Sequence, residues 1–374
     1  MKKIPPVDLA RQYQQIAHET DAAILAVLKS GYYIGGPVVS EFEQQFAEYV
    51  GTSYAISCNS GTDALYLAVL ALEIGPGDEV ITPSFTFFAT AEMVSQTGAT
   101  PVFVDIDPLT FNLDPHKLEA AITPKTKAII PVHLFGQPVD MTTVMNIAEK
   151  HHLFVIEDCA QATGAKWQDK QVGSWGHINA FSFFPTKNLG GCGDGGAVTT
   201  NDPILADKVR MLKEHGSRQR YFHEAIGINS RLDALQAAIL QIKLRYLDEW
   251  NQQRRQAAQL YTELLTPIPH LILPTEIVGG EHVWNQYTIR IQNDDSKEIN
   301  RDRVREKLQE VGVLSMIYYP IPLHLQVVYQ NLGYPLGSFL QTEAIAEEVL
   351  SLPMFPGINI EEQQQVAYAL KEAL

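Results

Sequence analysis

Lys187 stands in a segment of aromatic, proline and glycine residues, FSFFPTKNLGG, which continues as CGDGG. Burial in such surroundings favours the neutral amine over the ammonium ion. A neutral lysine can form a Schiff base with a carbonyl compound. A surface lysine on a glycine-rich loop has the same pattern, and for one lysine taken alone that is the better interpretation.

Two other segments carry groups that a Schiff-base lysine would need. Ser60-Gly61-Thr62 joins an expected strand to an expected helix, where N–H groups, hydroxyls and the positive helix end suit a phosphate. Asp158 follows Glu157 at the end of an apolar run, where a carboxylate could hold a ring nitrogen protonated, bind a metal or cap a helix. Taken alone, each segment is more simply explained by helix capping.

The combination favours pyridoxal 5'-phosphate chemistry. An enzyme of that kind must supply a lysine, an acid beside the pyridine nitrogen and a phosphate cradle. Each feature occurs once and each follows an expected strand, which is where α/β sheets bind their ligands. We therefore predict Lys187 as the Schiff-base lysine, with one of the two acids Glu157 and Asp158 beside the ring nitrogen, and expect no metal.

The elements that position these segments follow from two alternating periods between residues 40 and 200. Short β-branched runs alternate with amphipathic stretches, which is typical of a mostly parallel sheet covered by helices. A capping box at Ser40 is expected to open one helix, and a long helix is expected over Arg231–Trp250. Seven strands are expected, at Tyr54–Ser57, Glu79–Thr82, Pro101–Asp105, Ala128–His133, Leu153–Ile156, Ala180–Phe183 and Ala197–Thr200.

The order of expected elements changes after residue 250. A helix, a strand, a helix, a proline-rich bend and a final helix follow. We therefore expect a cofactor-binding large domain over residues 1–250 and a smaller C-terminal α+β domain over residues 251–374. A chain of 374 residues suits this division.

Composition excludes several classes of function. The net charge of −15 argues against a sequence-independent nucleic-acid binder, which needs Lys and Arg facing phosphates. Three cysteines without a C-x-x-C pair indicate a reducing compartment. No stretch reads as a signal peptide or membrane span. We expect a cytoplasmic protein that binds neither nucleic acid nor membrane.

The chain resembles the DegT/DnrJ/EryC1/StrS family of sugar aminotransferases, within the aspartate-aminotransferase fold superfamily. The resemblance runs from PPVDLARQY to LSLPMFPGI. It implies a three-layer α/β/α large domain with a seven-stranded, mostly parallel sheet. It also implies that Lys187 bonds to the cofactor, that Asp158 pairs with the pyridine nitrogen, that Gln161 lies near the phenolic oxygen and that Phe87 covers the ring.

The resemblance further implies a phosphate site built from Gly61, Thr62 and Ser182. The segment GINSR resembles a loop that reaches across a dimer interface. There Asn229 would complete the partner's phosphate site, and Arg231 could meet the carboxylate of the amino-acid substrate, for which its guanidinium fork is suited. A homodimer with shared active sites is thus expected.

Two segments resemble the sugar-side regions of the family. GYYIGGP, with Tyr33, resembles the loop near the nucleotide-sugar site, and YYPIPLHLQ, with Tyr319 and His324, resembles the segment facing the sugar. Relatives commonly have His-Tyr-Pro where this chain has Tyr318-Tyr319-Pro320, so no direct role is assigned to residue 318. A packed or surface histidine explains His324 equally well.

The implied reaction moves an amino group from L-glutamate, which leaves as 2-oxoglutarate, through pyridoxamine phosphate to a keto sugar carried by a nucleotide. KNLGGCGDGGAV, together with YPIPLH, favours a 3-keto dTDP- or UDP-hexose over a 4-keto one. A dehydratase would have histidine at position 187, and a regulatory relative would have lost the lysine or the acid. A cysteine desulfurase, an amino-acid transaminase and a non-catalytic interaction protein fit the sequence less well.

Overall fold

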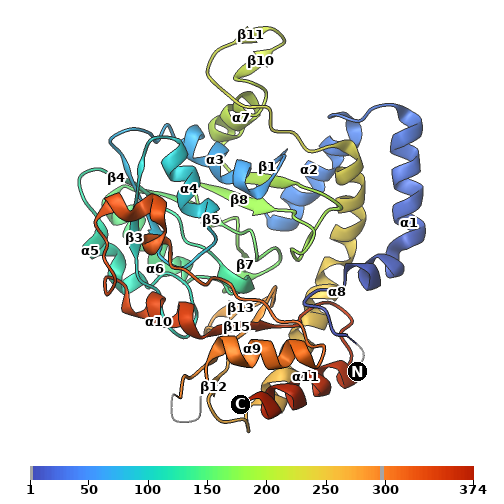
Figure 1. Cartoon of the computed structure of the whole chain (residues 1–374). Coiled ribbons are helices and arrows are strands. Elements are labelled where there is room, and N and C mark those ends of the chain that lie inside the picture. Colours follow the sequence, from blue (N-terminus) through green and yellow to red (C-terminus); the bar gives the residue numbers. More distant parts are fainter. Residues whose placement is uncertain (1–2, 295–298) are drawn as a thin grey trace.

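A seven-stranded sheet forms the centre of the chain in the computed structural model, which describes residues 3–294 and 299–374 (Figure 1). Its strand order is β1-β9-β8-β5-β4-β2-β3. Strand β9 runs antiparallel to both of its neighbours, and the remaining neighbours pair in parallel. The strands are β1 (Tyr54–Cys58), β2 (Glu79–Pro83), β3 (Thr100–Val104), β4 (Thr126–Ile129), β5 (Phe154–Asp158), β8 (Ile178–Ser182) and β9 (Gly196–Thr200).

All seven expected strands are present, and two of them end two or more residues from the predicted position. Strand β5 continues to Asp158, two residues beyond the predicted end. Strand β4 ends at Ile129, whereas the prediction reached His133. Beyond it, Val132 pairs with Asp158 only through one isolated bridge. Apolar runs predict where a strand lies better than where its pairing stops.

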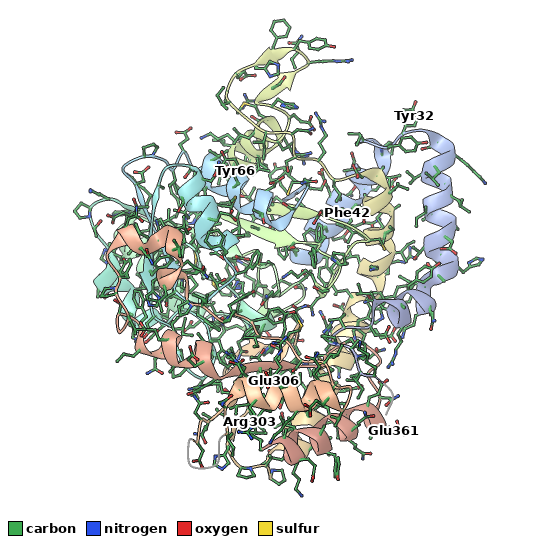
Figure 2. All side chains as sticks on the ribbon, in the orientation of Figure 1. Tyr32, Phe42, Tyr66, Arg303, Glu306 and Glu361 are labelled. Atoms are coloured by element: carbon green, nitrogen blue, oxygen red, sulfur yellow. The ribbon has the colours of Figure 1, made fainter. Side chains whose placement is uncertain are left out.

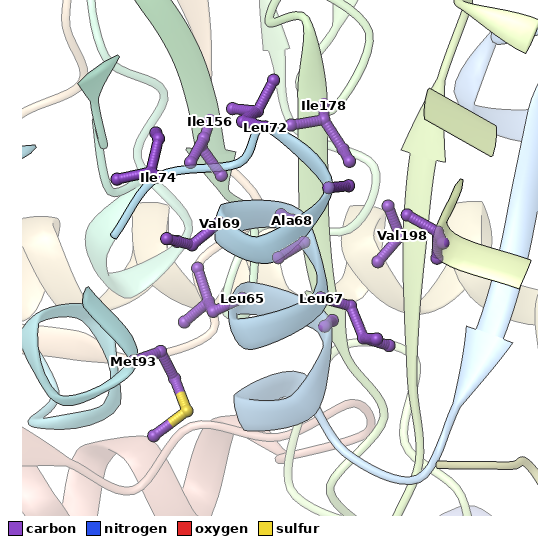
Figure 3. Close-up of a cluster of buried hydrophobic side chains, with 14 of the residues drawn as sticks. Leu65, Leu67, Ala68, Val69, Leu72, Ile74, Met93, Ile156, Ile178 and Val198 are labelled. Atoms are coloured by element: carbon purple, nitrogen blue, oxygen red, sulfur yellow. The ribbon is translucent and has the colours of Figure 1, made fainter. Parts of the chain in front are cut away.

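Alternating side chains along the strands enter different layers of the core. In β5, Ile156 joins a cluster under α3, whereas Val155 joins a cluster on the opposite face with α6. In β8, Ile178 lies under α3, whereas Phe181 packs with α2 and α8. Figure 3 shows α3 laid against Ile156, Ile178 and Val198. Helices therefore cover both faces of the sheet, as expected for the three-layer arrangement.

Eleven α-helices surround or extend this sheet in the described part of the chain. α1 packs along α8 at one side of the molecule (Figure 1). The helices are α1 (Leu9–Ser30), α2 (Pro37–Val50), α3 (Gly61–Ala71), α4 (Ala89–Gln96), α5 (Leu118–Ala121), α6 (Met141–His151), α7 (Pro203–Leu212), α8 (Ala234–Leu265), α9 (Arg301–Glu310), α10 (Leu340–Glu348) and α11 (Ile360–Ala373). None of these helices combines the length and apolar character that a membrane crossing requires.

The predicted capping box at Ser40 is wrong. Helix α2 already begins at Pro37, after Gly36, and proline is favoured at a first helical position because it has no N–H to leave unpaired. Glu43, the other end of the supposed box, instead accepts hydrogen bonds from the backbone and hydroxyl of Ser57. Figure 2 shows Phe42 of this helix inside the molecule, beside the sheet, whereas Tyr32 lies at the outer edge.

The long helix expected over Arg231–Trp250 begins three residues later and continues fifteen residues further, to Leu265. Its first half, with Leu240 and Leu247, packs on the sheet. Its second half, with Tyr261 and Leu265, packs in a separate cluster with C-terminal elements. Residue 250 therefore lies inside one helix, and the division of the chain at that point remains a prediction.

Short strands complete the C-terminal part and the edges of the molecule. β12 (Leu271–Ile272), β14 (Tyr287–Ile291) and β15 (Val349–Leu352) form one sheet beside α9 and α11. Ile4, near the N-terminus, is buried in the same cluster. The remaining strands are β6 (Lys166–Trp167), β7 (Lys170–Gln171), β10 (Ser217–Gln219), β11 (Phe222–His223) and β13 (Gly280–Glu281).

Candidate active site

A cavity of about 380 Å³ lies beyond the carboxyl ends of β1, β5 and β8. These three ends meet at one edge of the sheet because the strands run in the same direction. Eight of the predicted site residues line it: Gly61, Thr62, Phe87, Asp158, Gln161, Ser182, Lys187 and Tyr319. The first and last of them, Gly61 and Tyr319, are 258 residues apart in the chain, so the fold alone brings them together.

One wall of the cavity is the first turn of α3. The hydroxyl of Ser60 caps this helix by accepting a hydrogen bond of 3.0 Å from the N–H of Asp63. A side chain on Gly61 would bring its Cβ within 2.5 Å of the Cβ of Ser182, so only glycine lets the two segments approach this closely. Thr62 and Ser182 add hydroxyls beside the positive helix end, an arrangement that suits a phosphate.

The two acids at the end of β5 have different environments. Asp158 faces the cavity, where its Oδ2 accepts a hydrogen bond of 2.9 Å from the hydroxyl of Thr90 and its Oδ1 accepts one of 3.1 Å from the N–H of Ala160. Burial raises the pKa of Asp158, while these two donors and the amine of Lys187 oppose that shift. Its side chain can therefore hold a cationic group that enters the cavity.

Glu157 is fully buried on the other side of the strand. Its carboxylate accepts hydrogen bonds from the backbone N–H groups of Gly173, Trp175 and Gly176, and it lies 3.0 Å from Nε2 of His133. Because Nδ1 of His133 accepts a hydrogen bond from the N–H of Val139, Nε2 carries the ring proton and donates a hydrogen bond to Glu157. Glu157 is therefore committed to the protein's own backbone.

Lys187 lies in the irregular segment between β8 and β9. Its N–H donates to the carbonyl of Phe184, and its side chain lines the cavity. Burial lowers the pKa of Lys187 to about 8, and the carboxylate of Asp158 opposes part of that shift. A larger share of this amine is neutral near pH 7 than for an ordinary lysine, as a nucleophilic or proton-moving amine requires.

An aromatic wall and a fixed carboxamide close the cavity. Phe87 is 56% exposed although it lines the cavity, and its ring lies 6.0 Å from that of Tyr319. A planar ligand could stack on such a face. Gln161 accepts a hydrogen bond of 2.7 Å from the N–H of Phe135 and donates one of 3.1 Å to the hydroxyl of Tyr319.

Four predicted site residues lie outside this cavity. Arg231 forms an ion pair with Glu214, at 2.7 Å between Nη2 and Oε2. Asn229 is exposed and pairs with Glu214 through its backbone. Between them, the buried Ser230 turns inward and donates a hydrogen bond of 2.6 Å to Asp63 beside the helix cradle. Asn229 and Arg231 therefore do not reach the cavity of their own chain.

Tyr33 and His324 are also placed elsewhere. Tyr33 is 48% exposed, and its hydroxyl donates to the carbonyl of Leu28 at 3.3 Å. His324 is buried, with Nε2 2.9 Å from Oε1 of Glu343 and its ring edge against Phe339. Of the two interpretations left open for His324, the structure has the packed one, since the glutamate and the aromatic ring enclose the imidazole.

Sequence reasoning missed two hydroxyls that act on the site. Thr86 lines the cavity, and Thr90 binds Asp158 directly; their hydroxyls lie 3.2 Å apart. Both stand in PSFTFFAT, where only Phe87 was singled out. Two threonines four residues apart in that segment were the available signal. Tyr318 also lines the cavity, although no role was assigned to it.

The profile of the DegT/DnrJ/EryC1/StrS aminotransferase family matches residues 14–371. A pleiotropic regulatory protein of Geobacillus stearothermophilus is 48% identical over 99% of this chain and 98% of its own length. The dTDP-3-amino-3,4,6-trideoxy-alpha-D-glucose transaminase of Streptomyces venezuelae is 45% identical over 99% of this chain and 96% of its own.

A relative with a different nucleotide in its name is equally similar. The UDP-N-acetyl-3-dehydro-alpha-D-glucosamine 3-aminotransferase of Acidithiobacillus ferrooxidans is 46% identical over 99% of this chain and 98% of its own length. Among solved structures, DesV of S. venezuelae in complex with a ketimine intermediate has a TM-score of 0.95 at 44% identity, covering 100% of this chain and 98% of that one. NtdA of Bacillus subtilis with bound cofactor PMP has a TM-score of 0.91 at 34% identity, covering 100% and 85%.

Proposed function

The chain belongs to the DegT/DnrJ/EryC1/StrS aminotransferase family, and on that premise we propose that it moves an amino group from L-glutamate to a keto group of a nucleotide-bound hexose, with pyridoxal 5'-phosphate as cofactor. One observation carries the proposal. A single cavity joins a partly buried lysine of lowered pKa, a buried carboxylate and a helix end that has room for a phosphate. The solved relative with bound PMP supports the cofactor.

The residues of the cavity fit this cofactor part by part. The first turn of α3, with Thr62 and Ser182, would hold the phosphate, and Phe87 would cover one face of the ring. Asp158 would keep a proton on the pyridine nitrogen, and Gln161 would lie near the ring's phenolic oxygen. When bound, the cofactor withdraws electrons from the carbon that carries the amino group.

Lys187 would perform the proton transfers. Its Nζ takes the proton from the carbon that bears nitrogen in glutamate, and it gives a proton to the sugar carbon that receives the nitrogen. This needs an amine that is neutral in part of its cycle, which the lowered pKa of about 8 provides. Asp158 supports the same step, because a proton held on the ring nitrogen favours removal of the proton from the donor carbon.

The amine is proposed to go to C3 of the sugar. Two relatives that match 98% or more of this chain are named for sugars modified at position 3. One name gives a 3-amino dTDP-sugar and the other a 3-dehydro UDP-sugar. The segment Lys187–Val198, together with YPIPLH, is the sequence feature that favours C3. The product would be an amino sugar for a surface polysaccharide or a glycoside.

The active enzyme is proposed to be a homodimer in which each subunit completes the other's site. Neither Asn229 nor Arg231 lines the cavity of its own chain, whereas Ser230 between them is buried and binds Asp63 in the first turn of α3. The adjoining β10–β11 hairpin projects from the body of the chain in Figure 1 and exposes Tyr221 and Ile226, which a second copy could cover. A cytoplasmic location is proposed as well, and three free cysteines support it.

Product analysis would test the reaction directly. Purified protein, pyridoxal phosphate and L-glutamate are mixed with 3-keto and 4-keto sugars on dTDP and on UDP, and the products are identified by mass spectrometry and NMR. We expect amine at C3 of one 3-keto sugar and a matching yield of 2-oxoglutarate. Amination of a 4-keto sugar alone would overturn the C3 assignment, and no amination of any sugar would overturn the proposed function.

A further inference from the structure

Asn251 of α8 links the loop that carries Lys187 to the loop that follows Asp158. Its Oδ1 accepts a hydrogen bond of 2.7 Å from Nδ2 of Asn188, the residue after Lys187. Its Nδ2 donates one of 3.1 Å to the carbonyl of Thr163, in the loop that follows Asp158. We propose that Asn251 is a positioning residue that sets the separation between the proton-moving amine and the acid. This inference rests on the function proposed above.

The orientation of the Asn251 carboxamide is fixed by chemistry. A backbone carbonyl such as that of Thr163 can only accept, so it must face the NH₂ group, and the oxygen is then left for Asn188. Both asparagines are buried, with 9% of Asn251 and 3% of Asn188 exposed. Water therefore cannot readily replace these hydrogen bonds if the side chain is removed.

The neighbouring backbone is shaped to admit this carboxamide. Gly164 follows Thr163 and has a φ of +94°, a conformation that L side chains rarely adopt. A Cβ at this position would lie 2.5 Å from Nδ2 of Asn251. The loop after Asp158 thus comes close to α8 only because residue 164 is glycine.

The other side of Lys187 is held from the same face of α8. Arg254, one turn after Asn251, is buried and donates to the carbonyls of Trp284 and Asn285 at 3.3 and 3.2 Å. Asn285 in turn donates a hydrogen bond of 3.3 Å to the carbonyl of Thr186, the residue before Lys187. Residues on both sides of the lysine are therefore tied to one helix.

A rigid reference of this kind matters for proton transfer. α8 runs as one helix from the sheet to the C-terminal elements (Figure 1), so its side chains keep fixed spacings. Displacing a reacting group by about 1 Å can cost roughly 100-fold in rate. Loss of the Asn251 bridge should therefore reduce turnover although Asn251 lines no part of the active-site cavity.

The test is the variant Asn251→Ala in the full chain. We expect kcat to fall about 10- to 100-fold, with KM for both substrates within about threefold of the original. In the apoprotein, hydrogen exchange should quicken in peptides covering residues 159–164 and 184–190. Because Asp158 raises the pKa of Lys187, a wider separation should also move the pH midpoint of reductive methylation of Lys187 to a lower value.

Gln363→Ala is the matched control. Gln363 is another buried carboxamide that binds α8, since it donates a hydrogen bond of 2.7 Å to the carbonyl of Ala257, but it lies outside the active-site cavity. Its removal should lower Tm about as much as Asn251→Ala while kcat and the Lys187 midpoint stay unchanged. If Asn251→Ala does not fold, Asn188→Ala gives the same readouts, and when both fold the double variant should be no worse than the worse single one.

The outcomes separate the inference from the proposed function. A wild-type protein that carries no borohydride-stable tag on Lys187 would overturn the proposed function. A tagged wild type, together with unchanged kcat and midpoint in Asn251→Ala and Asn188→Ala, would overturn only the positioning role. Equal effects from Gln363→Ala would also overturn it, because a general loss of packing would then explain the result.

Discussion

The Cβ of Ser182 lies where a side chain on Gly61 would stand, since an added Cβ would come within 2.5 Å of it. The start of α3 and the end of β8, 121 residues apart in the chain, thus share the same space. This close contact predicts that a side chain at position 61 weakens the proposed phosphate site.

Gly61→Ala should weaken binding of pyridoxal phosphate to the apoprotein by about tenfold or more, because the clash pushes the helix end away from Ser182. A fluorescence titration measures this. Ser182→Gly alone measures how much the side chain of Ser182 contributes to the affinity for pyridoxal phosphate. Gly61→Ala combined with Ser182→Gly should bind better than the sum of the two losses predicts, since the second change removes the Cβ that lies 2.5 Å away. Strict additivity would contradict the steric explanation.

Reactivity of Lys187 should depend on pH with a midpoint near 8, well below that of an ordinary lysine. In the apoprotein, reductive methylation of Lys187, followed by peptide mass spectrometry, should increase as pH rises through that value because the amine loses its proton there. Asp158→Asn removes the charge that raises the pKa of Lys187, so the midpoint should move lower. The exposed Lys150 serves as the internal reference. A midpoint near 10 for Lys187 would contradict the structural reading.

Thr90→Val should lower kcat about tenfold, because Asp158 loses the hydroxyl that stabilises its charged form. The pKa of Asp158, already raised by burial, would rise further, so less of it would be ionised. Thr90→Ser keeps the hydroxyl and should retain most of the activity. A steady-state assay compares the wild type, Thr90→Val and Thr90→Ser. Equal rates for the two variants would contradict a role of the Thr90 hydroxyl in the reaction.

Mixing two inactive variants should restore activity if the proposed dimer shares its sites. Lys187→Ala lacks the amine and Asn229→Ala lacks the group offered to the partner, so a heterodimer has one site with both intact. Random reassociation should recover up to about a quarter of the wild-type rate per subunit. The separate proteins, assayed at the same total concentration, are the control. No recovery despite heterodimers detected by native mass spectrometry would contradict the cross-subunit role of Asn229.

The strands and the main site residues were predictable because their signals are local. Apolar runs located all seven strands of the sheet, and the residues directly after β1, β5 and β8 identified the cavity. The periods alone did not distinguish Glu157 from Asp158 as the cavity acid; the family resemblance did. The structure supplies the reason, since neighbouring side chains of β5 face opposite layers and Glu157 meets His133 there.

The hydrogen bonds that support the site could not be predicted from the sequence, because they join residues far apart in the chain. Thr90 and Asp158 are 68 residues apart, and no periodic pattern reports a hydrogen bond across that distance. Asn251 lies one residue beyond the helix expected to end at Trp250. The helix in fact continues to Leu265, where a different apolar face packs with C-terminal elements. Ser40 matches the capping-box pattern with Glu43, but it is not a cap because the helix already begins at Pro37.

The reversed direction of β9 has a consequence for how the protein tolerates change in chain length. A parallel successor to β8 would require a crossover to the opposite edge of the sheet, whereas β9 lets the segment 183–195 leave and re-enter at the same edge. Every residue added to or lost from that segment therefore alters the cavity. Turns at the opposite edge, such as Gly75–Asp78 before β2, lie away from the cavity and can change length without reshaping it.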